Sequence, residues 1–592
     1  MRKIFQYILM AVAVVVTASC SNDIDETLHP AGNGALQFVV SDFPTFGEGT
    51  QTRAIGTQDE GKTAWENGDQ IIITLTSQKY GEQAAALTYN GSSWSTEASL
   101  SYLENETPSI SVIYAPCYEV TEEGVMQLRS GMQLGMTEYL SGNYEMENGI
   151  MTITFEGAIR DYSRLRIAGL PNQTLTVTTT DFTPAGATEV ATAAYTLTAD
   201  DKGNAYLYGT FAKDATVTVM QGDVIRVSYP FTAETEQGKS YALDARPVID
   251  LSQYSEGEIV EISSGGRIIG DGNEYNLTLN ITADATVIFD VRTSGVNLGG
   301  SITVSDGKTL TLLVEGNAEH TVKGGISFGN GYNVIIEGDL TQENNKLTVT
   351  SSDGNAGIGA NGGVIAGDIT IRNARVDTTG SSREAPELST SASISGAAIG
   401  TSDGSMGDIL IENSIIVAEG GYYESTSHAA AIGIGYVGST MGNITLKDSQ
   451  ITARNNGDGL ASVIGAGGSH FVSGVVGALG DIIITNTDLN LSVVISIMNL
   501  YPPIIGPGSG HSDQQFNMGK IVFTDMTQTE LDEMIAKWNF PEDFNEWSDY
   551  VLGRGIDGIA YGTQTFDGVW VSDGADGLVR IDDGNGYYKS GI

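Results

Sequence analysis

Short alternating runs of apolar and polar residues dominate the chain from about Leu36 onward. Gly, Asn, Asp and Ser separate these runs, and helical periodicity is nearly absent. A period of two predicts β-strands with one buried face, and the turn residues between the runs favour antiparallel pairing. Residues 36–250 are therefore predicted to form one or two β-sandwich modules. The clearest predicted strands are Gln70–Leu75, Ile110–Tyr114, Met151–Phe155 and Thr174–Val177.

The second half of the chain repeats a different pattern. Between the copies of its main motif stands a shorter element that ends in Ile-Gly. The period is roughly 32–41 residues, within the range that is typical of solenoids. The main motif, Gly-Asp/Asn-Ile-x-Ile/Leu-x-Asn/Asp, begins at Gly367, Gly407, Gly442 and Gly480, with a weaker copy at Gly519.

Each repeat offers three short strands, for instance Ala398–Ile399, Ile409–Ile411 and Ile415–Val417. One repeat cannot bury its own apolar face, so stacked copies must share a continuous core. Three strands and three turns close one rung of a parallel β-helix, with isoleucines stacked inward at ~4.8 Å per rung. The repeats therefore predict a right-handed parallel β-helix over residues 260–525.

The turns of this solenoid carry recurrent glycine and asparagine. Glycine beside each strand suits sharp corners where a Cβ would crowd or where φ must be positive. Asn373, Asn413 and Asn486 recur where a strand meets a turn. We expect them to adopt the left-handed conformation or to form hydrogen bonds along the stack, rather than to contact a ligand.

A solenoid needs atypical ends that protect its open edges. Ser301–Val304 and Asn333–Gly338 are interpreted as degenerate opening rungs. Thr527–Trp538 spaces its apolar residues for one face of a helix, which would cap the final rung. Residues 526–592 are thus predicted to form a C-terminal helix and a small β cap. The all-β class of the whole chain follows.

The first residues have the features of a bacterial export signal. Arg2 and Lys3 precede the apolar run Ile4–Val16 and the small residues before Cys20, which resemble a lipobox. The run is shorter than the ~20 residues that a membrane span needs. We expect residues 1–19 to be removed and Cys20 to carry the lipid that anchors the chain to a membrane. An ordinary signal peptide with a chance cysteine is the alternative.

Acidic residues follow the cysteine within residues 20–35. In Bacteroides-type bacteria such residues resemble a signal for transfer to the outer face of the outer membrane. A solvated polar tether is the other interpretation. We expect an outer-membrane lipoprotein that faces the cell surface.

Length, charge and cysteine content narrow the alternatives. A chain of 592 residues exceeds the ~250–300 residues of a single core, which favours two or three domains. A net charge of −44 argues against nucleic acid as a partner, because phosphate binding needs clustered Lys and Arg. Cys117 has no partner once Cys20 is acylated, so a disulfide framework is not expected.

Seven short motifs follow one another over about 220 residues of the first half. They are Arg53-Ala54, Trp65–Ile71, Tyr89–Trp94, Val112–Pro116, Ile153–Phe155, Arg164–Ile167 and Gly238–Tyr241. Their order behind a lipobox resembles the fimbrillin family of Bacteroides-type bacteria. The family often has a histidine after the strand ending at Phe155, where this chain has Gly157-Ala158.

The resemblance implies a two-part β-sandwich subunit of surface fimbriae or of a stand-alone adhesin. In polymerising members, proteolysis after an arginine frees a groove that a strand of the next subunit fills, a form of β-strand addition. Arg53 stands at the matching place. The alternative is that Arg53 is a solvated loop residue.

The sequence contains few candidates for catalytic or metal-binding residues, and no catalytic residue is assigned. Glycoside hydrolysis would need two carboxylates ~5–10 Å apart, and none of the many acidic residues forms an evident pair. The sequence Ser-Asp-Gly occurs around Asp353, Asp403 and Asp573 and is typical of turns. Calcium binding at these turns remains an alternative, and no other cofactor is expected. His470 and His511 could stack on adjacent rungs, but without a third ligand no metal site is expected.

Exposed aromatic residues are the more promising feature. Tyr422 and Tyr423 fall in the longest insertion between rungs, where their rings could bind a sugar or could pack on the rungs. The leading hypothesis is a non-enzymatic adhesin or a fimbrial anchor or tip component, with the membrane, other fimbrial subunits, host proteins or glycans as partners. The alternative is a surface protein that binds or degrades glycans with its β-helix.

Overall fold

The structure, a computed structural model, divides the chain into two compact units. The first contains the residues up to Asp244 except Gly169–Gln173 and Ala199–Gly203, which are grouped with Ala245–Ile592 in the second. The described residues are 37–44, 62, 64–98, 100–102, 107–147, 150–155, 160–291, 293–383, 394–423, 427–435, 439–455, 461–467, 476–493, 503–508, 515–538, 552–553, 563–572, 577–584 and 586–588.

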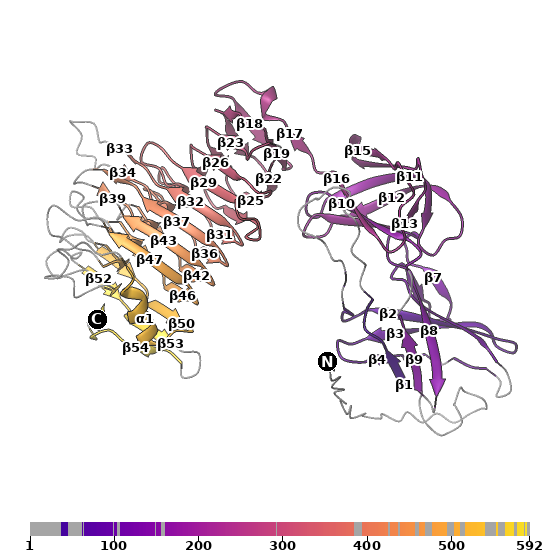
Figure 1. Ribbon diagram of the computed structural model, residues 1–592. Coiled ribbons are helices and arrows are strands. Elements are labelled where there is room, and N and C mark those ends of the chain that lie inside the picture. The colour runs from indigo at the N-terminus through magenta and orange to yellow at the C-terminus, as the bar shows by residue number, and fades with distance from the viewer. Residues whose placement is uncertain are drawn as a thin grey trace, which may run out of the picture. The chain divides into compact units, whose positions relative to one another are not determined.

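The first unit begins with a seven-stranded sheet (Figure 1). Its strand β2 (Gln70–Ser77) is buried on both faces, since Ile71 and Ile73 enter one apolar cluster and Ile72 another. A hairpin of β6 (Tyr118–Val120) and β7 (Met126–Leu128) forms a separate two-stranded sheet that packs against the cluster containing Ile72. In spatial order the sheet contains β1 (Gln37–Val40), β9 (Ile150–Thr154), β8 (Leu140–Glu147), β5 (Ser109–Tyr114), β2 (Gln70–Ser77), β3 (Gly81–Tyr89) and β4 (Trp94–Ser95).

A second seven-stranded sheet completes this unit, and the four predicted strands are confirmed across the two sheets. The expectation of antiparallel pairing is wrong for β1 with β9 and for β10 (Ser163–Ala168) with β16 (Ser240–Asp244), which are parallel. Each of these pairs joins segments far apart in the chain, as a parallel pair requires. The second sheet contains β15 (Val224–Pro230), β14 (Thr216–Gln221), β11 (Thr174–Pro184), β13 (Asn204–Phe211), β10 (Ser163–Ala168) and β16 (Ser240–Asp244), with β12 (Ala191–Thr198) paired to β11.

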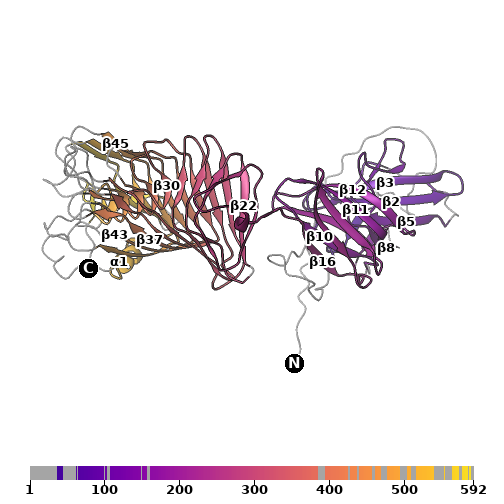
Figure 2. The same ribbon diagram turned by 90° about the horizontal axis from the view of Figure 1, so that it is seen from above.

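The second unit is a parallel β-helix with three sheets, called walls 1, 2 and 3 in the order in which the chain visits them (Figures 1 and 2). The predicted all-β class, with a β-helix in the second half, is confirmed. Wall 1 contains β17 (Val248–Ile249), β19 (Gly266–Gly270), β22 (Ala285–Val291), β25 (Thr309–Val314), β28 (Asn333–Glu337), β31 (Ile369–Arg372), β36 (Ile409–Glu412), β42 (Ile444–Lys447), β46 (Ile482–Thr485), β50 (Ile521–Thr524), β53 (Val569–Ser572) and β54 (Val579–Arg580).

Walls 2 and 3 follow the same stacking. Wall 2 contains β20 (Glu274–Tyr275), β23 (Asn297–Leu298), β26 (Glu319–Val322), β29 (Lys346–Thr350), β32 (Arg375–Thr379), β37 (Ile415–Gly420), β43 (Gln450–Asn455) and β47 (Asp488–Val493). Wall 3 contains β18 (Ile259–Ile262), β21 (Thr278–Ile281), β24 (Ile302–Val304), β27 (Ile326–Phe328), β30 (Ile358–Ala360), β35 (Ile399–Thr401), β40 (Ile432–Ile434), β44 (Ile464–Ala466), β48 (Ile505–Gly506), β51 (Leu552–Gly553) and β55 (Tyr587–Tyr588).

The second unit also contains smaller elements outside the three walls. A fourth row of short strands, which sequence reasoning missed, lies between walls 3 and 1. Two hairpins and a short 3-10 helix, Leu251–Gln253, complete the unit. The fourth row contains β41 (Thr440–Met441), β45 (Val476–Leu479), β49 (Gln515–Met518) and β52 (Thr563–Phe566), and the hairpins pair β33 (Ser382–Arg383) with β34 (Ile394–Ser395) and β38 (Tyr422–Tyr423) with β39 (Ser427–His428).

The core of the β-helix is a continuous stack of aliphatic side chains. In wall 1 the register aligns Ile369, Ile409, Ile444, Ile482 and Ile521, all of them fully buried. Burial of this aligned column stabilises the stack through the hydrophobic effect. The predicted inward stacking of isoleucines is thereby confirmed.

Wall 3 contains the aligned Ile-Gly elements. Gly400 has φ +142° and lies beside Gly433, which has φ +135°. A Cβ at Gly400 would collide with the carbonyl oxygen of Gly433. Glycine is therefore required both for the backbone conformation and for the close approach of adjacent rungs, as its position beside the strand predicted.

The predicted helix is present as α1 (Gln528–Ile535). Thr527 and Glu530 form a capping box that satisfies backbone N–H groups of its first turn. Its apolar face is buried, and Trp538 Nε1 donates a hydrogen bond to the carbonyl oxygen of Leu489 in β47 (2.8 Å). The helix thus covers the last strand of wall 2, while β51 and β53 continue walls 3 and 1.

Candidate functional site

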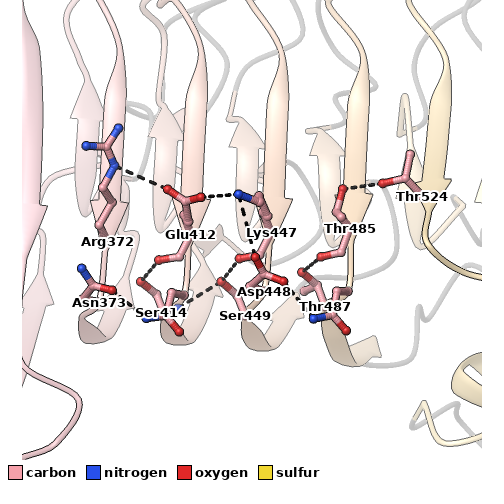
Figure 3. Close-up of polar contacts among 12 residues, drawn as sticks. Arg372, Asn373, Glu412, Ser414, Lys447, Asp448, Ser449, Thr485, Thr487 and Thr524 are labelled. Atoms are coloured by element: carbon pink, nitrogen blue, oxygen red, sulfur yellow. Dashed lines mark hydrogen bonds and ion pairs between the residues drawn. The ribbon is translucent and has the colours of Figure 1, made fainter. Parts of the chain in front are cut away.

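Polar side chains line the corner between walls 1 and 2 (Figure 3). Asn373, Asn413 and Asn486 have φ of 50°, 45° and 42°. Asn413 Nδ2 donates to Asn373 Oδ1 (2.6 Å), and Asn486 Nδ2 donates to Asp448 Oδ1 (2.8 Å). Both predicted roles of these asparagines, the left-handed conformation and bonding along the stack, are confirmed.

Hydroxyl and charged groups at this corner also bond to one another (Figure 3). Ser414 Oγ donates to the carbonyl oxygen of Glu412 (2.8 Å), and Ser449 Oγ donates to that of Lys447 (2.6 Å). The Glu412 carboxylate also pairs with Lys447 Nζ (2.6 Å) at an exposed position, where an ion pair contributes little stability. This corner holds the rungs in register and leaves few groups for a ligand.

A pocket of about 400 Å³ lies on the outside of the β-helix, along wall 3 of the early rungs. Its volume is within the ~300–1,000 Å³ of small-ligand sites. None of its lining side chains carries a charge. The lining residues are Thr278, Gly299, Gly300, Ser301, Gly324, Ser327, Ser352, Asn355 and Asn361.

The first unit offers a different candidate, residues 37–44, which we call the leading segment. Its strand β1 pairs with β9 at one end of the sheet. Beyond β1, the Ser41 N–H donates to the carbonyl oxygen of Ile153 (2.9 Å), and the Phe155 N–H donates to Ser41 Oγ (2.9 Å). Trp65 Nε1 donates to the carbonyl oxygen of Ser41 (2.8 Å). The segment is thus held by backbone pairing and by a side chain that follows it in the chain.

Aromatic packing completes this attachment. The Phe43 ring lies edge-on to Trp65, with centroids 4.9 Å apart, and edge-on to Tyr114 at 5.6 Å. Phe43 is buried, and Phe38 and Val40 pack against the same cluster. Edge-to-face pairs add ~0.5–1.5 kcal/mol beyond the buried area. The segment fills an apolar socket made by the strands that follow it.

A buried ion pair lies at the end of the leading segment. Arg160 Nη2 donates to the carbonyl oxygen of Pro44 (2.8 Å) and to Glu138 Oε2 (3.0 Å). Burial raises the pKa of the Glu138 carboxyl, and the Arg160 guanidinium opposes that rise. Because a buried charge without its partner is costly, this pair fixes the guanidinium that holds Pro44.

Several residues singled out by sequence fall outside the described residues. These are Cys20, Arg53, His470, His511 and Asp573.

Tyr422 and Tyr423 form β38, which pairs with β39, and their side chains lie outside the described part of the structure. Asp353 has φ 58°, and Asp403 Oδ1 accepts the Gly362 N–H (2.6 Å), so both serve in turns. Over the described ranges, no group of three His, Cys, Asp or Glu residues is arranged to hold a metal ion. Cys117 is buried and forms no disulfide.

Sequence reasoning missed the pocket of wall 3 and the attachment of the leading segment. Within the part of the chain that is described, no helix has the length and apolarity needed to cross a bilayer.

Comparison with known proteins adds little. No protein-family profile and no curated protein matches the chain. Among solved structures, a candidate cell-adhesion protein of Bacteroides fragilis aligns with 35% of this chain and 92% of its own, at 10% identity and a TM-score of 0.19. A likeness at this level carries no argument about fold or function.

Proposed function

We propose that this chain is a cell-surface lipoprotein of adhesion, working as a fimbrillin-like stand-alone adhesin or as an anchor or tip subunit of a fimbria. Lipid on Cys20 would hold it in the outer membrane, and the β-helix would be its binding region. The lipobox-like start and the order of landmarks in the first half support this proposal.

The attachment of the leading segment carries the proposal. The segment precedes Arg53, whereas its hydrogen-bonding and aromatic partners all follow Arg53. A cut after Arg53 would leave the segment held by non-covalent contacts alone. Its departure would uncover the edge of β9 and an apolar socket, which a strand from another subunit could occupy by β-strand addition.

Cleavage after Arg53 would also determine whether the protein stays attached to the membrane. Arg53 follows Cys20, so cleavage after Arg53 would separate the folded chain from its lipid. An uncut molecule would remain a membrane-bound adhesin or anchor, and a cut molecule would be free to join a polymer. At the corner between walls 1 and 2 the polar groups bond within the stack, which favours a structural role for this corner over a catalytic one.

The test is the N-terminus of the protein on intact cells. In a fimbrial subunit we expect a chain that begins at Ala54, together with ladders on gels after mild heating. R53A and R53K should both block an arginine-specific cut, and R53K keeps the charge. Finding only intact, lipidated monomer would exclude polymerisation and leave the adhesin or anchor. Loss of C20A from the cell surface is expected in either case, and its retention there would contradict lipid anchoring.

A further inference from the structure

The pocket of wall 3 arises from unequal connections between walls 2 and 3. Residues 299–301 join β23 to β24, and residues 323–325 join β26 to β27, whereas the longer segment 351–357 joins β29 to β30. Because the strands stay in register, the longer connection must project beyond its neighbours. The projecting segment 351–357 lies beside the two short connections, which we call the flush corners, and the pocket lies between this segment and those corners.

Glycine makes the flush corners possible. A Cβ at Gly300 would collide with the carbonyl oxygen of Leu277, and a Cβ at Gly324 would press on the backbone of Gly300. The corners of successive rungs therefore meet through their backbones, and the floor of the pocket has no large side chains. A ligand could approach this floor closely, as glycine surfaces allow.

Fixed polar groups surround this floor. Asn361 Oδ1 accepts the Ala356 N–H (2.7 Å), which orients the amide, and the Ser402 hydroxyl lies 3.0 Å from both Asn361 Oδ1 and Asp403 Oδ1. Across the pocket, Thr278 Oγ1 and Ser301 Oγ lie 3.3 Å apart. Each hydroxyl can both donate and accept, and the Asn361 Nδ2 group adds two donors.

Two further groups have capacity for a ligand. Ser327, at the outward position of β27, and the Asn355 side chain form no hydrogen bond with other side chains or backbone in the described ranges. These groups and the Asn361 amide are all neutral. The charged residues next to the lining in sequence already have partners, since Lys323 pairs with Glu274 (2.5 Å) and Asp353 Oδ2 accepts the Ser352 hydroxyl (3.1 Å).

We propose that this pocket binds a neutral, hydroxyl-rich ligand, such as a short segment of an uncharged oligosaccharide. A cationic ligand would find no carboxylate in the lining, and an anionic one would meet the field of a chain with net charge −44. Hydroxyl and amide groups match the alternating donors and acceptors of a sugar. The lining has no aromatic platform, so we expect weak binding, with a Kd on the order of 1 mM. This site is additional to the proposed assembly through the leading segment.

The test uses the full mature chain without its lipid, in the form C20A. Saturation-transfer NMR would be recorded with neutral mono- to tetrasaccharides of glucose, galactose, mannose, fucose and N-acetylglucosamine, and with glucuronic acid and sialic acid as charged probes. Signal from at least one neutral probe is expected, with at least 10-fold weaker binding to S327W, which fills the pocket. T452W is the matched control on the outward face of β43, in wall 2, and should bind like the parent.

S327A is a milder variant that removes only the hydroxyl and should weaken binding a few-fold. The proposal is overturned if no neutral probe binds, if only acidic sugars bind, or if S327W binds as well as T452W. These outcomes do not depend on Arg53 or on polymerisation, so failure here leaves the adhesin proposal standing. Conversely, if the chain is found uncut at Arg53 on cells, the proposal of a sugar-binding pocket is unaffected.

Discussion

Replacing Phe43 by alanine should loosen the leading segment without unfolding the rest of the first unit. Phe43 is 5% exposed and packs edge-on against Trp65 and Tyr114. Truncating a buried phenylalanine typically costs ~3–5 kcal/mol. Since the ring belongs to the segment and its contacts belong to the socket, this loss should fall mainly on the equilibrium between docked and released segment.

Hydrogen exchange measures that equilibrium directly. The Ser41 N–H is protected by its bond to Ile153, and exchange through local opening follows the free energy of that opening. A loss of ~3 kcal/mol corresponds to exchange that is about 100-fold faster at Ser41, at 1.4 kcal/mol for each factor of ten. Amides of β2, an interior strand of the sheet, should keep their rates.

Val39 provides the matched control. It lies in the same leading segment, in β1, but is 52% exposed, so V39A should change the opening free energy by less than ~0.5 kcal/mol. Equal acceleration in β1 and β2 of F43A would refute the reasoning. It would mean that the segment opens only when the whole sheet unfolds, and that it could not be exchanged for another strand.

Two further predictions concern the β-helix. G433A should lower the free energy of unfolding of this unit by ~1–3 kcal/mol or more, because alanine at φ +135° is strained and its Cβ would meet the backbone of Gly465. Urea unfolding measures this loss. A curve that matches that of the outward-facing control T445A would contradict the prediction. Burial holds the pKa of His320 below its ordinary value of 6.5, and its ring accepts the Val296 N–H and bonds to the Glu315 carbonyl oxygen. The unfolded state then binds the proton more readily, so this contribution to stability is complete above pH 6.5 and is lost as the pH falls. Unfolding curves of H320N should therefore lack part of the acid sensitivity of the parent, and parallel curves would show that His320 titrates alike in both states.

The aromatic residues predicted to be exposed show that a local sequence pattern did not locate the pocket. Tyr422 and Tyr423 attracted attention because they lie in an insertion, but the described pocket lies several rungs earlier and is lined by small polar residues and glycine. Its signal in the sequence is the lengthened connection at 351–357 beside two short ones. That contrast becomes visible only after the strands on both sides have been aligned.

The repeat itself determined most of the second unit. A Gly-Asp/Asn-Ile motif at a solenoid period is enough to predict stacked rungs, because each copy must bury its isoleucines against the next. Asn373 and Asn413 were predictable for a related reason, since the left-handed corner is a local backbone requirement. The helix that ends wall 2 was equally local, with Thr527 and Glu530 as its capping box.

Tertiary structure alone decided the features that join distant parts of the chain. The parallel pairing of β1 with β9, the socket of Phe43 and the pair Glu138–Arg160 each link residues separated by many others in sequence. Alternating hydrophobicity marks which face of a strand is buried, but it does not choose the neighbouring strand or its direction. Those choices depend on how the whole sheet closes around its core, and they are the choices that made the leading segment and the wall 3 pocket candidates for function.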